Sequence, residues 1–189
     1  MKKVIIIYLI CLFLGSCCQS EKKVRINQVS TSQMVFLNYS EKMNTVWAIN
    51  VPFEIEIKNE TSSRIKLVGH NYIYGNQRKG TFSKMYELID TQLKEINLKT
   101  EGIDPLNSKQ YIVYSKHFVD TSEYNNDYFR KEVEVLRIDD RKKIAVGSIE
   151  EFKLHYSKCS NSLYQKDSLK FSFYDADNDK FIKLKTSIK

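Results

Sequence analysis

Phe53-Glu54-Ile55-Glu56-Ile57 alternates apolar and acidic side chains, and this stretch decides the fold class. Successive side chains of a β-strand point to opposite faces of a sheet, so the alternation puts the apolar residues on one face. A continuously apolar stretch, Tyr111-Ile112-Val113-Tyr114, is typical of a central strand. The two-residue period recurs at residues 65–67, 96–98, 133–135, 152–154, 169–173 and 181–184.

Polar, turn-forming clusters separate these segments, for example at residues 59–63 and 175–180. About seven to nine short strands at this spacing predict a mostly β protein, folded as an antiparallel β-sandwich. The segment Ile103-Asp104-Pro105-Leu106 resembles the turn between late strands of immunoglobulin-like exported domains. That resemblance implies an immunoglobulin-like sandwich, although the Cys…Trp…Cys framework of true immunoglobulin domains is missing from the sequence.

Residues 82–96 fit two interpretations. The apolar positions 82, 85, 86, 89, 93 and 96 lie on one face of a helix, which would give one short helix. The same residues also fit two strands near 84–90 and 93–99, with a turn at 90–92. Because the neighbouring segments have strand patterns, we favour the two strands. A further short helix around residues 122–131 is an alternative to strand or loop there.

The N-terminus has the pattern of an export signal. Lys2 and Lys3 precede eleven apolar residues, 4–14. A basic start followed by a short apolar run is typical of a signal peptide. As a helix this run would be about 16 Å long, whereas a bilayer core is about 30 Å thick. The segment therefore predicts an export signal rather than a membrane span.

Leu14-Gly15-Ser16-Cys17 follows the apolar run and resembles the lipobox of bacterial lipoproteins. The resemblance implies attachment of diacylglycerol to the Cys17 sulfur, cleavage before Cys17, and acylation of the new N-terminus by a fatty acid such as palmitate. We therefore expect a signal peptide at 1–16, a lipidated cysteine and polar tether at 17–30, and one β-sandwich domain at 31–189. The protein would be exported and lipid-anchored to a membrane of the bacterial cell envelope.

The net charge and its distribution limit the classes of partner that we expect. The 189 residues include 30 Lys and Arg against 23 Asp and Glu, a formal net charge of +7. The basic residues are scattered instead of forming a stripe with aromatic residues, so we expect no nucleic-acid partner.

Two of the four cysteines remain available in the mature protein. Cys11 lies in the expected signal peptide and Cys17 is the expected lipidation site, which leaves Cys18 and Cys159. A disulfide between them is one alternative, and a buried, unreactive Cys159 is the favoured interpretation.

The titratable residues form few recognisable motifs. Asp175, Asp177 and Asp179 have the alternate spacing of a calcium loop, but Lys180 and Thr186 replace the Gly and Glu that an EF-hand needs. We therefore favour a hairpin turn and keep a cation site as the weaker alternative. His70, His117 and His155 form no metal-binding motif, and the sequence has no Gly-x-Ser-x-Gly or phosphate-binding loop. No cofactor and no catalytic residue are expected.

Twelve tyrosines are the most unusual feature of the composition. Tyrosine offers an amphipathic contact surface at a small cost in side-chain entropy. We expect a non-catalytic binding or structural role in the envelope, with another envelope protein or a glycan as partner. One alternative is a glycan- or peptidoglycan-binding module that uses exposed tyrosines, and a second is a small envelope hydrolase. The candidate binding residues are Tyr72, Tyr74, Tyr124 and Tyr128.

Overall fold

The computed structural model describes residues 23–75, 83–120, 122–124, 128–163 and 166–188. These residues form two antiparallel sheets with eleven strands, together with three helices. The expected mostly β, sandwich-like fold is confirmed, although the strands outnumber the seven to nine expected. Within the described residues, no helix combines the length and the apolar character that crossing a membrane requires.

Sheet A is built around one long strand, β3 (Thr45–Asn59). One edge of β3 pairs with β8, and the other edge is shared by β2 at residues 45–50 and β1 at residues 54–59. The other members of sheet A are β1 (Val24–Val29), β2 (Phe36–Ser40), β5 (Ser83–Ile89), β6 (Gln92–Glu95), β8 (Ser108–Phe118) and β9 (Lys143–Ala145), in the order β6-β5-β8-β3-β2-β9 with β1 beside β3.

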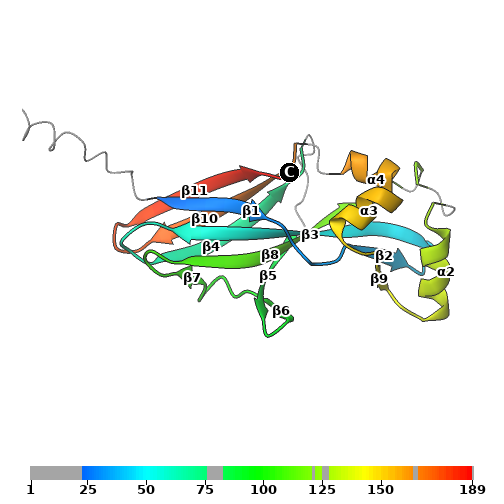
Figure 1. Ribbon diagram of the computed structural model, residues 1–189, viewed down its shortest axis with the longest axis horizontal. Coiled ribbons are helices and arrows are strands. Elements are labelled where there is room, and N and C mark those ends of the chain that lie inside the picture. The colour runs from blue at the N-terminus through cyan, green and yellow to red at the C-terminus, as the bar shows by residue number, and fades with distance from the viewer. Residues whose placement is uncertain (1–22, 76–82, 121, 125–127, 164–165, 189) are drawn as a thin grey trace, which may run out of the picture.

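Sheet B has four strands in the order β11-β10-β4-β7. It lies beside β1 and the C-terminal half of β3 (Figure 1). The core between the sheets is aromatic and aliphatic, and Phe53 of β3 stacks on Tyr72 of β4 with ring centroids 5.7 Å apart. The strands of sheet B are β4 (Ile65–Ile73), β7 (Gly102–Ile103), β10 (Ser168–Asp175) and β11 (Lys180–Ser187).

Three helices gather at the other end of the molecule, near β2 and β9 (Figure 1). They are α2 (Arg130–Ile138), α3 (Ile149–His155) and α4 (Ser157–Ser162). A capping box starts α3, because Ser148 accepts from the Glu151 N–H and the Glu151 carboxylate accepts from the Ser148 N–H. Buried Val133, Leu136 and Phe152 join the hydrophobic core here.

Two strand predictions are wrong at these helices. Val133 is buried but Val135 is 41% exposed, and the second buried position is Leu136. Spacing of three residues is helical, so the apparent alternation at 133–135 was accidental. Similarly, Phe152 is fully buried whereas Leu154 is 76% exposed on α3. The helix considered around 122–131 is α2, which starts only at Arg130.

The favoured interpretation of residues 82–96 is confirmed in its essentials. β5 and β6 form a hairpin, and Asp90 and Thr91 turn the chain with φ values of 46° and 70°. The alternative of one short helix is therefore wrong. The strand expected at 96–98 is absent, because β6 ends at Glu95. The tether expected at 17–30 is also wrong over its second half, since Val24–Val29 form β1 and pair with β3.

Buried Asn59 joins the end of β3 to the segment around β7. Its Nδ2 atom donates to the carbonyl oxygens of Ser63, Ile103 and Asp104 at 2.8, 3.0 and 3.1 Å. Its Oδ1 atom accepts from the N–H and hydroxyl of Thr61 at 3.0 and 2.6 Å. One side chain thus satisfies several backbone groups that the loops leave without sheet partners.

Candidate functional site

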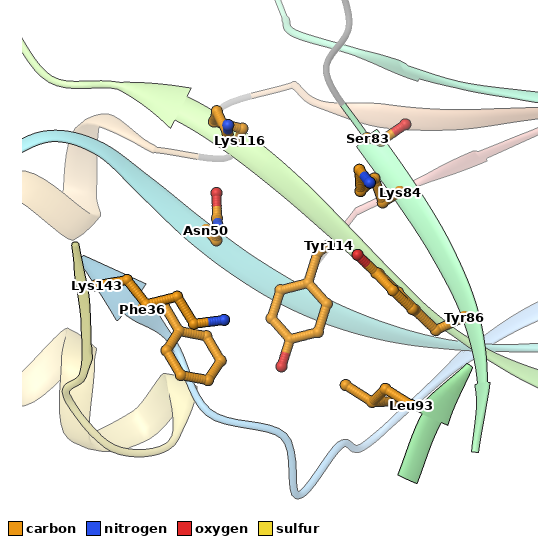
Figure 2. A pocket seen from close by; sticks show the side chains of 9 residues that line it. All are labelled: Phe36, Asn50, Ser83, Lys84, Tyr86, Leu93, Tyr114, Lys116 and Lys143. Atoms are coloured by element: carbon orange, nitrogen blue, oxygen red, sulfur yellow. The ribbon is translucent and has the colours of Figure 1, made fainter. Parts of the chain in front are cut away.

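A pocket lies on the outer face of sheet A, which is turned away from sheet B. Side chains alternate along β8, so Val113 and Ser115 are buried toward the core while Tyr114 and Lys116 lie on the opposite face. The cavity has a volume of about 610 Å³, within the usual size range of ligand pockets. Figure 2 shows the nine lining residues: Phe36, Asn50, Ser83, Lys84, Tyr86, Leu93, Tyr114, Lys116 and Lys143.

Strand register brings these residues together from distant parts of the chain. Asn50 on β3 pairs with Phe36 on β2 and, across the other edge, with Lys116 on β8. Two residues earlier on β8, Tyr114 pairs with Lys84 on β5. Paired residues of neighbouring strands point to the same face, so the register alone places an aromatic, amide and lysine set on one surface.

Tyr114 is the central ring of the pocket. Its centroid lies 6.0 Å from that of Phe36, with the planes at 47°, and 6.0 Å from that of Tyr86, with the planes at 85°. The Tyr114 hydroxyl donates to the carbonyl oxygen of Met34 at 3.2 Å. Burial raises the pKa of Tyr114 to about 12, so the phenol stays neutral at ordinary pH. The three rings give the pocket an apolar wall held in place by strand pairing.

Three lysines add positive charge to this wall. The Lys143 ammonium lies 4.2 Å from the Phe36 ring centroid, and the Lys116 ammonium lies 5.1 Å from that of Trp47. Lys84 forms an ion pair with Glu95 at 2.9 Å, and its pKa is raised by that hydrogen bond. Among the described residues, no carboxylate lies within ion-pair distance of Lys116 or Lys143. The pocket therefore carries uncompensated positive charge.

Asn50 contributes a polar atom whose partner is missing among the described residues. Its Oδ1 atom is buried and accepts no hydrogen bond from them, whereas its Nδ2 atom donates to Asn38 Oδ1 at 3.5 Å. An unpaired buried acceptor is unfavourable unless a bound group donates to it. The pocket thus offers ammonium donors, an amide acceptor and aromatic faces in one place.

A second polar cluster lies inside the sandwich. Ser115 Oγ and His117 Nε2 are 2.8 Å apart, and the Tyr72 and Tyr74 rings pack edge-on against His117 at 5.5 and 5.0 Å. Tyr72 donates to Asp167 at 2.7 Å. A serine beside a histidine is the pairing that nucleophilic catalysis uses. Here, however, the exposed fractions of Ser115 and His117 are 0% and 5%, so no substrate reaches the hydroxyl.

Burial also sets the protonation of this cluster. Desolvation lowers the pKa of His117 to about 4, so the imidazole is neutral at pH 7. Burial and the acceptor Asp167 raise the pKa of Tyr72 far above its ordinary value. These groups satisfy one another between the sheets, which is the behaviour of a structural polar network.

The four tyrosines predicted as a binding platform lie in two separate clusters. Tyr72 and Tyr124 are 0% and 4% exposed, so the expectation that they face solvent is wrong. Tyr74 is half-buried and donates to the carbonyl oxygen of Lys116. Tyr128 is half-buried and packs on Tyr124 with centroids 5.3 Å apart, near the helices. Large amphipathic rings have filled the core instead of the surface. The loop residues 125–127 between the latter two lie outside the described residues.

The aspartates at 175–179 form the turn that was favoured over a cation site. Asp175 Oδ2 accepts from Ser63 and from the Asn178 side chain, both at 2.8 Å, and Oδ1 accepts from two backbone N–H groups of the turn. The Asn178 hydrogen bond is the main reason why the pKa of Asp175 is lowered. Asp179 accepts from Tyr174 at 2.9 Å. In the part of the chain described, no three His, Cys, Asp or Glu side chains converge as a metal site would require.

Comparison with known proteins assigns no family. No protein-family model matches the chain, and no curated protein matches it. The outer pocket is therefore the feature on which a functional argument rests. Cys17, the predicted lipidation site, lies outside the described residues.

Sequence reasoning missed the pocket residues Phe36, Asn50, Tyr86, Lys116 and Lys143. Tyr114 and Lys116 lie two residues apart on one strand and so share a face, but the sequence does not show which strands lie beside them. Pairing of β8 with β3 on one side and β5 on the other is what assembles the pocket. The available signal was only the recurrence of aromatic and lysine residues at even spacing, as in Lys84 and Tyr86.

Proposed function

We propose that the protein is a lipid-anchored protein of the bacterial cell envelope that binds a ligand in the outer pocket of sheet A and catalyses no reaction. The lipobox-like Leu14-Gly15-Ser16-Cys17 supports the anchor. Two or more acyl chains give stable membrane attachment, each buried methylene contributing about 0.8 kcal/mol. The body of the protein would then hold its pocket at the end of a short tether.

The observation that carries the binding role is the contrast between the two polar clusters. The Ser115 and His117 pair is enclosed in the core, whereas the pocket around Tyr114 is an open cavity in which Lys116 and Lys143 have no carboxylate partner among the described residues. Recognition needs an accessible surface with unsatisfied groups, and hydrolysis needs an accessible nucleophile. The outer pocket meets the first requirement, and the buried pair does not meet the second.

Site-specific photo-crosslinking in intact cells tests the binding role. Lys84→p-benzoylphenylalanine places the probe at the pocket, and Lys66→p-benzoylphenylalanine places it at an exposed site on β4 of sheet B. We expect a defined adduct from the first position that is lost when Tyr114→Ala is added, and no such adduct from the second. Equal adducts from both positions, or none from the pocket, would contradict the proposal.

The anchor has its own test. Cys17→Ser should leave an unprocessed precursor without incorporated fatty acid, measured by metabolic labelling with an alkyne fatty acid and gel mobility. Cys18→Ser is the matched control and should be processed normally. Normal processing of the Cys17 variant would refute the lipid anchor while leaving the pocket experiment unaffected.

A further inference from the structure

The charges of the pocket point to an anionic ligand. Lys84, Lys116 and Lys143 line the cavity, and Glu95 is the only carboxylate paired with any of them in the described part of the chain. Lys116 and Lys143 instead lie over aromatic rings, which attract a cation weakly compared with a full negative charge. A ligand that brings an anionic group to either of these ammonium groups would gain charge-assisted hydrogen bonds.

The rings limit what else the ligand carries. Phe36, Tyr114 and Tyr86 give the wall apolar faces that are inclined to one another instead of forming one flat platform. A small inorganic anion would leave these faces in contact with water. A ligand with an apolar ring face of its own would cover them and gain the favourable transfer of apolar surface.

Asn50 indicates a third property of the ligand, which is a hydrogen-bond donor. Its buried Oδ1 atom is an acceptor and needs a donor, which a carboxylate or phosphate group does not possess. When the Asn50 amide turns its oxygen toward the cavity, a hydroxyl group next to the anionic group can donate to it and accept from a lysine. Sugar rings combine all three properties, since they have an apolar C–H face, hydroxyl groups at the rim and, in acidic sugars, a carboxylate or phosphate substituent.

We propose that the outer pocket binds an anionic saccharide, with its anionic group on the pocket lysines, a hydroxyl on Asn50 Oδ1, and the ring face on Tyr114. The inference rests on the proposed function, because it names the ligand class of the same pocket. Carboxylated and phosphorylated sugars share the chemistry, and the experiment separates them.

Isothermal titration calorimetry of the purified full-length chain, in detergent, tests the ligand class. The probes are tetragalacturonate, its methyl ester, glucose 6-phosphate, inorganic phosphate and hexaglutamate. We expect binding of tetragalacturonate or glucose 6-phosphate, with the first indicating a uronate source and the second a phosphorylated one. The methyl ester and inorganic phosphate should each bind at least about tenfold more weakly, because each lacks one of the required features.

Variants locate the binding. Lys116→Gln combined with Lys143→Gln should weaken binding of the acidic saccharide about tenfold or more and remove most of its salt dependence. Asn50→Ala should weaken it several-fold. Lys66→Gln removes an exposed charge from sheet B and is the control, which should bind as the wild type does.

Three outcomes would overturn the inference. They are equal binding of the ester and the acid, equal binding of hexaglutamate and tetragalacturonate, and no binding of any acidic saccharide. If the Lys84 crosslink to a cellular ligand persists in that last case, the pocket binds a ligand of another class and only the inference fails. If that crosslink is absent as well, the proposed function fails with it.

Discussion

Acidification should destabilise the folded protein through His117. The side chain lies between the sheets, and desolvation lowers its pKa from the ordinary 6.5 to about 4. Above pH 6.5 the imidazole is neutral in both the folded and unfolded chains, so its contribution to stability is fully present. Between pH 6.5 and about pH 4 the unfolded chain binds a proton that the folded chain does not. The free energy of unfolding therefore falls as the pH falls through this window.

The size of the effect follows from the width of the window. A pKa difference of about 2.5 units corresponds to roughly 3 kcal/mol, at 1.36 kcal/mol per unit. The Tyr72 and Tyr74 rings and the Ser115 hydroxyl that contact His117 are neutral, and desolvation is the cause of its lowered pKa. An amount of 3 kcal/mol is a large part of the 5–15 kcal/mol that typical domains have in total.

Urea unfolding of the wild type and of His117→Gln, between pH 7.5 and pH 4, measures the effect. Glutamine does not titrate, and its amide can keep a hydrogen bond to Ser115. The wild type should lose about 3 kcal/mol more than the variant across this range. Burial lowers the pKa of His70 as well, but His70 is present in both proteins and cancels. A stability difference that stays constant with pH, or an NMR titration of His117 near pH 6.5, would refute the reasoning.

Three further predictions concern buried groups. Asn59→Ala should lower the free energy of unfolding by about 2–3 kcal/mol in urea titrations, because it leaves buried carbonyl oxygens without donors; an unchanged midpoint would contradict this. Phe171→Ala should lower it by about 3–5 kcal/mol, since the fully buried ring packs in the core between the sheets, whereas Lys66→Ala as a surface control should change it little. Cys159 is 2% exposed and burial raises its pKa to about 11, so mass-spectrometric mapping should show alkylation by iodoacetamide at pH 8 at least about tenfold slower than in urea; equal rates would refute burial of the thiol.

Strands with a long, regular pattern could be predicted from the sequence. The alternation at Phe53–Ile57 and Leu169–Phe173 lies within β3 and β10, and the apolar stretch at Tyr111 lies within β8 beside two partner strands. The two alternating strands have one face in the core, whereas Tyr111, Ile112 and Val113 are all buried, and burial is the physical cause of both patterns. The pattern at these positions was therefore sufficient to predict the strands.

Alternation of apolar and polar residues over only three positions was not sufficient to predict a strand. Phe152 and Leu154 flank Lys153 in a way that fits a strand, but Ser148 and Glu151 form a capping box that starts a helix. That serine and glutamate, three residues apart, were the signal that would have corrected the prediction. For Val133 no comparable cap exists in the structure, since Phe129 at the start of α2 forms no side-chain hydrogen bond.

The candidate site was harder to predict than the fold. Whether a tyrosine faces the core or the solvent depends on the strand's orientation in the sheet, so Tyr72 and Tyr114 look alike in sequence although they lie on opposite sides of sheet A. The order of the strands also decides which residues line the pocket. Phe36 on β2 and Lys84 on β5 line the same pocket because β3 and β8 lie between their strands and join them into one sheet. Pairing between distant segments leaves little trace in a single sequence.

The strand order of sheet B also governs when the protein can fold. Ile73 of β4 pairs with Ser168 of β10, about a hundred residues later in the chain. Until residues 168–187 have been made, Phe171 and Phe173 cannot cover the inner face of sheet A, and Phe53 and Ile55 stay in contact with water. Sandwiches with such distant pairings typically fold in milliseconds to seconds. The two sheets therefore cannot close on one another until nearly the whole chain has been synthesised.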